Sequence, residues 1–291
     1  MTYQENKDIL ILGASGLIGR YLFNLLKKEE KVIGTYANNK KEGLFHFDIT
    51  KDSVQNLPIK GTGYCIICSA ITKLDECKER PDYSREINVR GIEKIMIDLK
   101  KRDILPIFIS SAAVFDGIRG WYKEEDEKNP ISTYGGQKAE VEDFINENLQ
   151  DFLIIRPGKV FGVKEGEGVL FTKWFEQYKK KEKIFCADDE ELSPNYVEDV
   201  ARAIKKLLKT GSKGIYHINP PEHYSRYEMA KKFFDYLGIE YTQLIRCSLD
   251  NLNFLEGKRA KKTFLDSSKF IRETQFRFTT LEKCFETIRH N

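Results

Sequence analysis

The sequence predicts an α/β fold, a doubly wound parallel sheet with a smaller C-terminal lobe. Strand-like and helix-like segments alternate over the first 155 residues, which is typical of a sheet with helices on both faces. The strand-like segments are continuous apolar runs, as in parallel strands that are covered on both sides. A glycine-rich segment joins the first strand to the first helix, and the alternation loosens only after Arg156.

The expected elements follow one another in a regular order. We expect strands over residues 8–12, 31–36, 44–47, 64–68, 104–109 and 152–155. Helices are expected over residues 17–29, 83–101 and 132–149, and in the first of them Leu17, Tyr21 and Leu25 share one face. The later part of the chain favours helices over residues 168–181, 195–208 and 225–237, with strands over residues 183–186 and 214–218.

Composition excludes several classes of protein. The chain is 41% hydrophobic and 32% charged, which does not fit a disordered or collagen-like sequence. Lys plus Arg is 48 against 45 Asp plus Glu, so a dedicated nucleic-acid binder is not expected. The longest uncharged stretch, residues 104–115, is shorter than the ~20 residues of a membrane span. The charged start, with Glu5, Lys7 and Asp8, is unlike a signal peptide, and we expect a cytoplasmic protein.

The six cysteines do not form a metal pattern. Cys65 and Cys68 make a CxxC sequence, but it lies inside an apolar strand-like run. We expect buried free thiols rather than a metal or redox site. The four histidines show no ligand grouping, so no required metal is predicted.

A GxxGxxG sequence at Gly13, Gly16 and Gly19 is the first chemical signal. It follows an apolar strand and opens an amphipathic helix, which is the setting of a dinucleotide-binding turn. Glycine permits the sharp turn, the approach of a pyrophosphate and the close packing of helix on strand. The N–H groups of the helix N-terminus then bind the anion. We expect this segment to contact a dinucleotide through Gly13, Ser15, Gly16, Leu17, Ile18 and Gly19.

We expect the chain to have two parts. Residues 1–160, with a contribution from about 195–220, are expected to form an NAD(P)-binding Rossmann domain. Residues 161–291 are expected to form mainly a substrate-binding lobe, with a cleft between the two.

The end of the second strand favours NADP over NAD. An acidic residue there would bind the ribose 2′-hydroxyl of NAD, but residues 32–41 contain none. They contain Thr35, Asn38 and Lys40, which suit a 2′-phosphate. The alternative is that Lys40 belongs to a solvated turn.

A tyrosine and a lysine four residues apart share one helix face. Four such pairs occur, at Tyr3/Lys7, Tyr36/Lys40, Tyr134/Lys138 and Tyr227/Lys231. Only Tyr134 opens the helix after the fifth strand, at the carboxyl side of the sheet where ligands bind. Ser111, at the end of that strand, supplies a hydroxyl partner. We therefore expect Ser111, Tyr134 and Lys138 to be catalytic.

Together these residues resemble the extended short-chain dehydrogenase/reductase superfamily. More closely, the chain resembles the dTDP-4-dehydrorhamnose reductase family. The similarity runs through ILILGASGLIG at 9–19, FDIT at 47–50, INV at 87–89, ISS at 109–111, VFDG at 114–117, YGGQK at 134–138, RP at 156–157, VFG at 160–162, VEDVA at 197–201, GIYH at 214–217 and LD at 265–266.

The resemblance implies an NADP-dependent reductase of a nucleotide-activated 4-keto-6-deoxy sugar. Tyr134 would donate the proton, Ser111 would bind the carbonyl oxygen, and Lys138 would lower the pKa of the tyrosine. The resemblance also implies cofactor contacts at Asp48, Ile49, Ser69 and Ala70. Its partners would be a small-molecule substrate rather than a nucleic acid or a membrane, and a homo-oligomer remains open.

The chain departs from the family near the sugar site. Alanine stands at 112 and 113, and Lys159 replaces an aromatic residue. We expect substrate contacts from Ala112, Val114, Lys159 and Arg259. Two other functions remain open. The Ser-Ser-Ala-Ala run is similar to nucleotide-sugar epimerases that use NAD. The resemblance also extends to the regulatory β subunit of methionine adenosyltransferase, which would make the chain a non-catalytic NADP-binding subunit.

Overall fold

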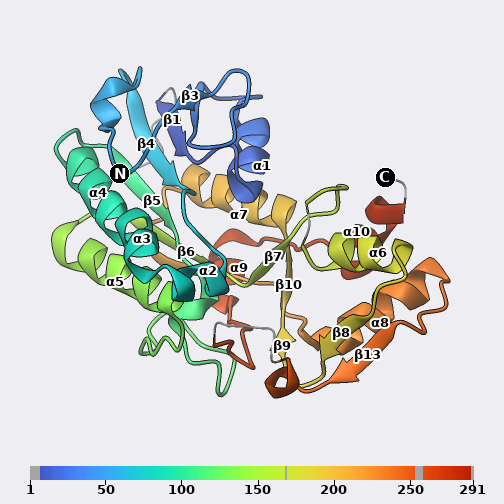
Figure 1. Cartoon of the computed structure of the whole chain (residues 1–291). Coiled ribbons are helices and arrows are strands. Elements are labelled where there is room, and N and C mark those ends of the chain that lie inside the picture. The colour runs from blue at the N-terminus through green and yellow to red at the C-terminus, as the bar shows by residue number, and fades with distance from the viewer. Residues whose placement is uncertain (1–6, 168, 253–257, 290–291) are drawn as a thin grey trace.

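The central element is a seven-stranded parallel sheet, seen in a computed structural model that describes residues 7–167, 169–252 and 258–289 (Figure 1). Its order is β11-β6-β5-β4-β1-β2-β3, which confirms the doubly wound α/β prediction. The strands are β1 (Asp8–Leu12), β2 (Val32–Tyr36), β3 (Phe45–His46), β4 (Thr62–Ile67), β5 (Leu105–Ile109), β6 (Leu153–Pro157) and β11 (Gly214–Ile218). The last strand comes from the late part of the chain and pairs with β6.

Helices cover both faces of this sheet, as Figure 1 shows. One face is covered by α4 (Gly91–Lys100) and α5 (Thr133–Asn148), whose apolar residues pack on Leu10, Ile67 and Phe108. The other face is covered by α1 (Leu17–Leu26) and α7 (Val197–Lys209), packed on Ile9 and Ile107. Neighbouring residues of one strand point to opposite faces, so both faces need apolar residues and the runs are continuous.

Two predicted helices differ from the observed elements. The segment expected as one helix over residues 83–101 consists of α3 (Pro81–Arg85), a π-helical turn (Glu86–Arg90) and α4. The helix expected over 195–208 begins only at Val197, because Pro194–Tyr196 is a strand, β10, that pairs with β7 (Lys159–Phe161). A short helix after β4, α2 (Leu74–Glu79), was not expected from the sequence.

The C-terminal lobe is built from short strand pairs and helices. Strand β8 (Ile184–Ala187) pairs with β13 (Leu244–Cys247), and β9 (Glu191–Leu192) pairs with β12 (Tyr224–Ser225). The lobe helices are α6 (Phe171–Lys179), α8 (Arg226–Leu237), α9 (Ser268–Thr274) and α10 (Leu281–Arg289). Helix α8 begins one residue later than expected, because Ser225 caps it together with Glu228.

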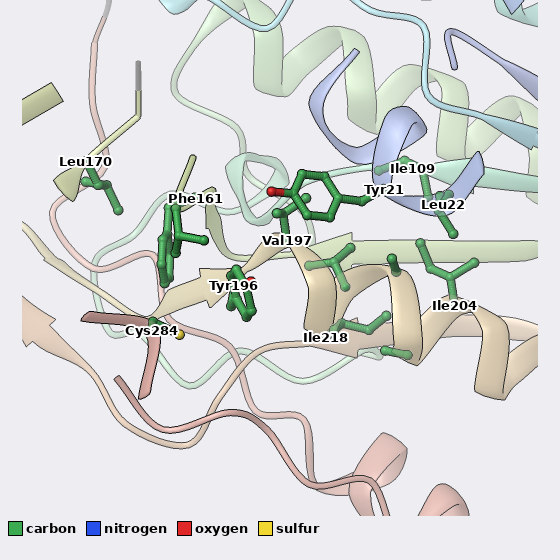
Figure 2. Close-up of a cluster of buried hydrophobic side chains, with 14 of the residues drawn as sticks. Tyr21, Leu22, Ile109, Phe161, Leu170, Tyr196, Val197, Ile204, Ile218 and Cys284 are labelled. Carbon is green, nitrogen blue, oxygen red and sulfur yellow. The ribbon is translucent and has the colours of Figure 1, made fainter. Parts of the chain in front are cut away.

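The lobe and the sheet share one hydrophobic core. In Figure 2, Tyr21 of α1 and Ile109 at the end of β5 lie in the same group as Phe161 of β7, Tyr196 of β10 and Cys284 of α10. The apolar cluster on this face of the sheet therefore continues into the lobe without a break.

The six cysteines are free thiols. Cys65, Cys77, Cys186 and Cys284 are buried as expected, whereas Cys68 and Cys247 are only half-buried. No helix in the described part of the chain has the length and apolar character needed to cross a membrane. The described residues also contain no cluster of three or more metal-ligating side chains.

Candidate active site

The glycine-rich turn lies at the carboxyl end of β1. Gly13 has a φ of +82°, and a Cβ there would be 2.8 Å from the backbone nitrogen of Ser69. A Cβ on Gly19 would be 2.2 Å from the carbonyl oxygen of Gly13, so helix α1 packs on the turn only because this residue is glycine. Gly16 is exposed, and it starts α1 without a side-chain cap. An exposed, uncapped helix N-terminus in this position suits a pyrophosphate.

The residues expected around the adenosine end lie beside this turn. Thr35 is buried, and its hydroxyl accepts a hydrogen bond of 3.1 Å from the Gly13 backbone N–H, so it supports the turn. Asn38 and Lys40 are exposed in the loop after β2. Asp48 follows β3, and hydrogen bonds from Thr50 hold the pKa of its carboxyl below the usual value. Ile49 is buried against Gly91 at the start of α4.

Ser69 and Ala70 follow β4 and are half-buried at the same edge. The loop that carries them is held by Asn88 of the π-helical turn. The Asn88 amide accepts from the Ile71 N–H at 2.8 Å and donates to the Ile71 carbonyl at 2.9 Å. It also donates to the Gln137 side chain at 2.8 Å. The sequence contained Asn88 in a family motif, but only the structure shows this anchoring role.

The three expected catalytic residues meet at the end of β5. Tyr134 is in the first turn of α5, and the hydroxyl of Ser111 is its side-chain hydrogen-bond partner. Ser132 caps the helix by accepting a 3.1 Å hydrogen bond from the Gly135 N–H. A Cβ on Gly135 would be 2.1 Å from the carbonyl oxygen of Ala113, so glycine at 135 lets the helix approach the Ser111 segment closely.

Both titratable side chains of this group are buried. Burial raises the pKa of the Tyr134 phenol, and the hydrogen bond from Ser111 opposes this rise. Burial lowers the pKa of the Lys138 ammonium to about 8. Lys138 donates to the Ile109 carbonyl at 2.8 Å, and its nitrogen is 5.8 Å from the centre of the Tyr134 ring. At neutral pH the site thus holds a protonated phenol beside a positive charge.

The lobe contributes charged residues on the other side of this edge. Lys159 starts β7 and has no ion pair within the described part of the chain. The residue as a whole is exposed, but desolvation of its ammonium, and then the charges of Arg226 and Arg259, lower its pKa to about 8. Arg226 forms a bidentate pair with Glu190 at 2.5 and 2.8 Å.

The other expected substrate residues have different surroundings. Arg259 pairs with Asp75 of α2 at 3.1 Å, and its Nε is buried without a hydrogen-bond partner in the described chain. Ala112 is buried in the turn after Ser111. Val114 is fully buried, and its backbone N–H and carbonyl are both used within the protein. Val114 therefore packs inside the protein, and its predicted contact with a substrate stays a prediction.

Comparisons with known proteins show the family of the chain. The family model described as "RmlD substrate binding domain" matches residues 7–289. Methionine adenosyltransferase 2 subunit beta of Bos taurus is 28% identical over 251 residues, which cover 82% of this chain and 75% of that protein. A probable low-salt glycan biosynthesis reductase of Haloferax volcanii is 26% identical over 282 residues and 94% of each chain.

Solved structures are similar over nearly the whole chain. A dTDP-4-dehydrorhamnose reductase of Bacillus anthracis, in complex with NADP, has a TM-score of 0.86 at 25% identity and covers 98% of this chain and 99% of its own. A hypothetical dTDP-4-dehydrorhamnose reductase of Sulfolobus tokodaii has a TM-score of 0.84 at 29% identity. The match covers 95% of this chain and 98% of that protein. The chain therefore belongs to the RmlD substrate-binding domain family, among the oxidoreductases of the extended short-chain dehydrogenase/reductase type.

Proposed function

We propose that the chain is an NADPH-dependent reductase of a nucleotide-activated 4-keto-6-deoxy sugar. The observation that carries the proposal is the meeting of Ser111, Tyr134 and Lys138 beside the glycine-rich turn. The family assignment and the NADP complex of the similar reductase support it. When bound, NADPH supplies the hydride for the carbonyl carbon.

The chain's own residues supply the proton and the charge stabilisation. Tyr134 is protonated at neutral pH because burial raises its pKa, so it can donate to an oxygen that becomes an alkoxide. The Ser111 hydroxyl can donate to the same oxygen. The Lys138 ammonium stabilises the phenolate left on Tyr134. Tyr134 and Lys138 are buried and Ser111 is half-buried, so such interactions are stronger here than in water.

Two groups of residues would bind the ends of the ligands. Asn38 and Lys40 are exposed beside the turn, where the 2′-phosphate of NADP would lie, and residues 32–41 contain no acid. Lys159 and the unpartnered Nε of Arg259 are donors for the oxyanions of the substrate diphosphate. Such cationic donors suit the diphosphate of a nucleotide sugar.

The direct test is oxidation of NADPH and of NADH with a panel of nucleotide-linked 4-keto-6-deoxy sugars, followed by absorbance of the reduced nicotinamide. We expect turnover with at least one sugar and a preference for NADPH. The absence of oxidation with every sugar would overturn the reductase proposal. A preference for NADH would overturn the assignment of Asn38 and Lys40.

A second candidate is a regulatory subunit that binds NADP without turnover. The 28% identity to methionine adenosyltransferase 2 subunit beta favours it. Binding of NADPH without oxidation by any sugar, together with a stable complex with a methionine adenosyltransferase catalytic subunit, would select this function. The retained Ser111, Tyr134 and Lys138 favour the reductase.

A further inference from the structure

A buried polar cluster lies directly behind the proposed catalytic group. It consists of Ser110, Glu142, Arg156 and His217, of which none is more than 3% exposed. The four residues come from the end of β5, from α5, from β6 and from β11, so one cluster joins three strands and a helix. The proposed chemistry does not use any of these side chains.

Glu142 is the centre of the cluster. Its Oε1 accepts a 2.5 Å hydrogen bond from the Ser110 hydroxyl and one of 3.0 Å from Arg156 Nε. Its Oε2 accepts a 2.6 Å bond from Arg156 Nη2. Lys128 Nζ lies 3.6 Å from the same oxygen. Such a buried carboxylate needs this set of donors, because an unpaired buried charge is strongly unfavourable.

Arg156 continues the cluster toward β11. Its Nη1 donates to the Glu124 carbonyl and contacts His217 Nε2, both at 3.2 Å. A guanidinium can only donate, so Nε2 accepts and the histidine proton is on Nδ1. Nδ1 then donates to the Tyr122 carbonyl at 3.0 Å. Burial and the charge of Arg156 lower the pKa of His217 to about 3, so this ring is neutral.

The cluster fixes the position of the segment at the end of β5 relative to helix α5. Ser110 immediately precedes Ser111, and Glu142 is one helical turn beyond Lys138 and two beyond Tyr134. Lys138 itself donates to the Ile109 carbonyl. Lys138 therefore binds Ile109, and Glu142, one turn later on α5, binds the next residue, Ser110.

We propose that Glu142, with Arg156 as its counter-ion, is a positioning residue that holds Ser111 against Tyr134 and Lys138 by binding the hydroxyl of Ser110. This inference rests on the proposed reductase function. Reacting groups must be held to a fraction of an ångström, and a displacement of about 1 Å can cost a hundredfold in rate. The tie at Ser110 acts on the residue adjacent to the hydroxyl that would bind the substrate.

Glu142 also acts on Lys138 through its charge. The titratable groups that face Lys138 are Tyr134 and Glu142 of its own helix, Cys68 after β4 and Cys77 of α2. Among the four, Glu142 is paired as a carboxylate and attracts the ammonium, which raises the pKa of Lys138 against the effect of burial. Removal of this charge therefore lowers the pKa of Lys138. The rate of turnover should fall at high pH as Lys138 loses its charge. Without the Glu142 charge, this high-pH limb of the rate profile moves to lower pH.

Two substitutions test separately the positioning of Ser111 and the effect of the Glu142 charge. Ser110→Ala removes one hydrogen bond and leaves the pair of Glu142 with Arg156 intact. Glu142→Gln keeps the shape and removes the charge. The matched control is Glu140→Gln, because Glu140 lies on the same helix but pairs with Arg85 at the surface. Folding of each variant is first checked by circular dichroism and thermal melting, since Glu142→Gln leaves Arg156 without its counter-ion.

We expect Ser110→Ala to lower kcat about tenfold, with the KM for NADPH and the pH profile unchanged, and Ser110→Thr to restore kcat. We expect Glu142→Gln to lower kcat and also to shift the high-pH limb to lower pH. Glu140→Gln should do neither. If Ser110→Ala and a folded Glu142→Gln both keep kcat within twofold of the wild-type value, the positioning role is wrong.

A second measurement does not depend on the catalytic activity of the protein. Amide hydrogen exchange of residues 110–114 should be about tenfold faster in Ser110→Ala than in the wild-type protein and in Glu140→Gln. Unchanged exchange would overturn the inference. Inactivity of the wild-type protein toward every keto sugar would instead count against the proposed function, so the two failures are distinguishable.

Discussion

Tyr134 has a chemically matched counterpart elsewhere in the chain. Tyr227 is also followed by a lysine four residues later, but it lies on α8 in the lobe. The two tyrosines differ in their surroundings, because only Tyr134 has a serine hydroxyl beside its phenol and a buried ammonium next to its ring. The motif is the same at both positions, and the neighbours from β5 distinguish them.

Tyr134→Phe removes only the proton donor and keeps the ring. We expect kcat to fall at least about a hundredfold, because general acid catalysis contributes that much or more. The affinity for NADPH, measured by fluorescence titration, should stay within about threefold. Tyr227→Phe is the control and should keep full activity. Turnover by Tyr134→Phe near the wild-type rate would show that the catalytic assignment is wrong.

Lys159 gives a pH dependence of substrate binding. Its pKa is lowered to about 8, so the ammonium is charged below pH 8 and loses its charge above it. Affinity for a nucleotide sugar, whose diphosphate diester keeps its charge over this range, should therefore fall as the pH rises through about 8. Calorimetric titration between about pH 6.5 and 9.5 measures this.

Lys159→Met should remove that dependence and weaken binding about tenfold at pH 7, since a charge-assisted hydrogen bond is lost. Lys180→Met, at an exposed position just after α6, is the control and should leave the titration unchanged. A binding curve in Lys159→Met that still falls through pH 8 would exclude Lys159 as the titrating group.

The elements of the sheet could be predicted from sequence because their signals are long and regular. The apolar runs of β1, β4 and β5 are five or six residues long, and the glycine turn fixes where α1 begins. The strands of the lobe are harder. Strands β9 and β12 have two residues each, which is too short for any periodicity to register.

Other features that the sequence did not predict depend on tertiary contacts, which no local sequence pattern contains. Pro194–Tyr196 forms a strand because β7 lies beside it, and helix α7 follows at the next residue. The anchoring of Ile71 by Asn88 joins residues 17 apart, and the tie of Ser110 to Glu142 joins residues 32 apart. The sequence predicted candidate site residues, and the structure shows what holds these residues in place.

Helix α5 offers a paired test of close packing. A Cβ at Gly135 would meet the Ala113 carbonyl oxygen, whereas a Cβ at Gly136 would meet nothing within 4 Å. Gly135→Ala should therefore push the helix away from the Ser111 segment, lower the free energy of unfolding by about 1–3 kcal/mol and abolish turnover. Gly136→Ala should raise it by up to about 1 kcal/mol, because alanine favours a helix. Denaturant melts and kcat measure both, and equal behaviour of the two variants would contradict the packing argument.

At the scale of the whole molecule, the largest apolar cluster of the described lobe residues is continuous with that of the sheet, and only a small second cluster, at Ala187, Leu249 and Leu252, belongs to the lobe alone. The cluster that begins on β1 and β5 includes Phe171 of α6, Phe233 of α8 and Phe285 of α10. Phe161 lies at the junction, with its ring 4.9 Å from Phe171 and 5.7 Å from Tyr196 (Figure 2). Two parts that share a core keep the candidate catalytic residues and the lobe residues in fixed relation.

A shared core predicts a single cooperative unfolding transition. Phe161→Ala should lower the free energy of unfolding by about 3–5 kcal/mol, because it removes a fully buried ring. Tryptophan fluorescence and far-ultraviolet circular dichroism should still give coincident urea curves, since the lobe cannot unfold without exposing the apolar face of the sheet. Phe185→Ala, at an exposed position on β8, should change stability by less than about 1 kcal/mol. Separated transitions in Phe161→Ala would mean that the lobe folds independently, and that the cleft can open by a movement of one whole part against the other.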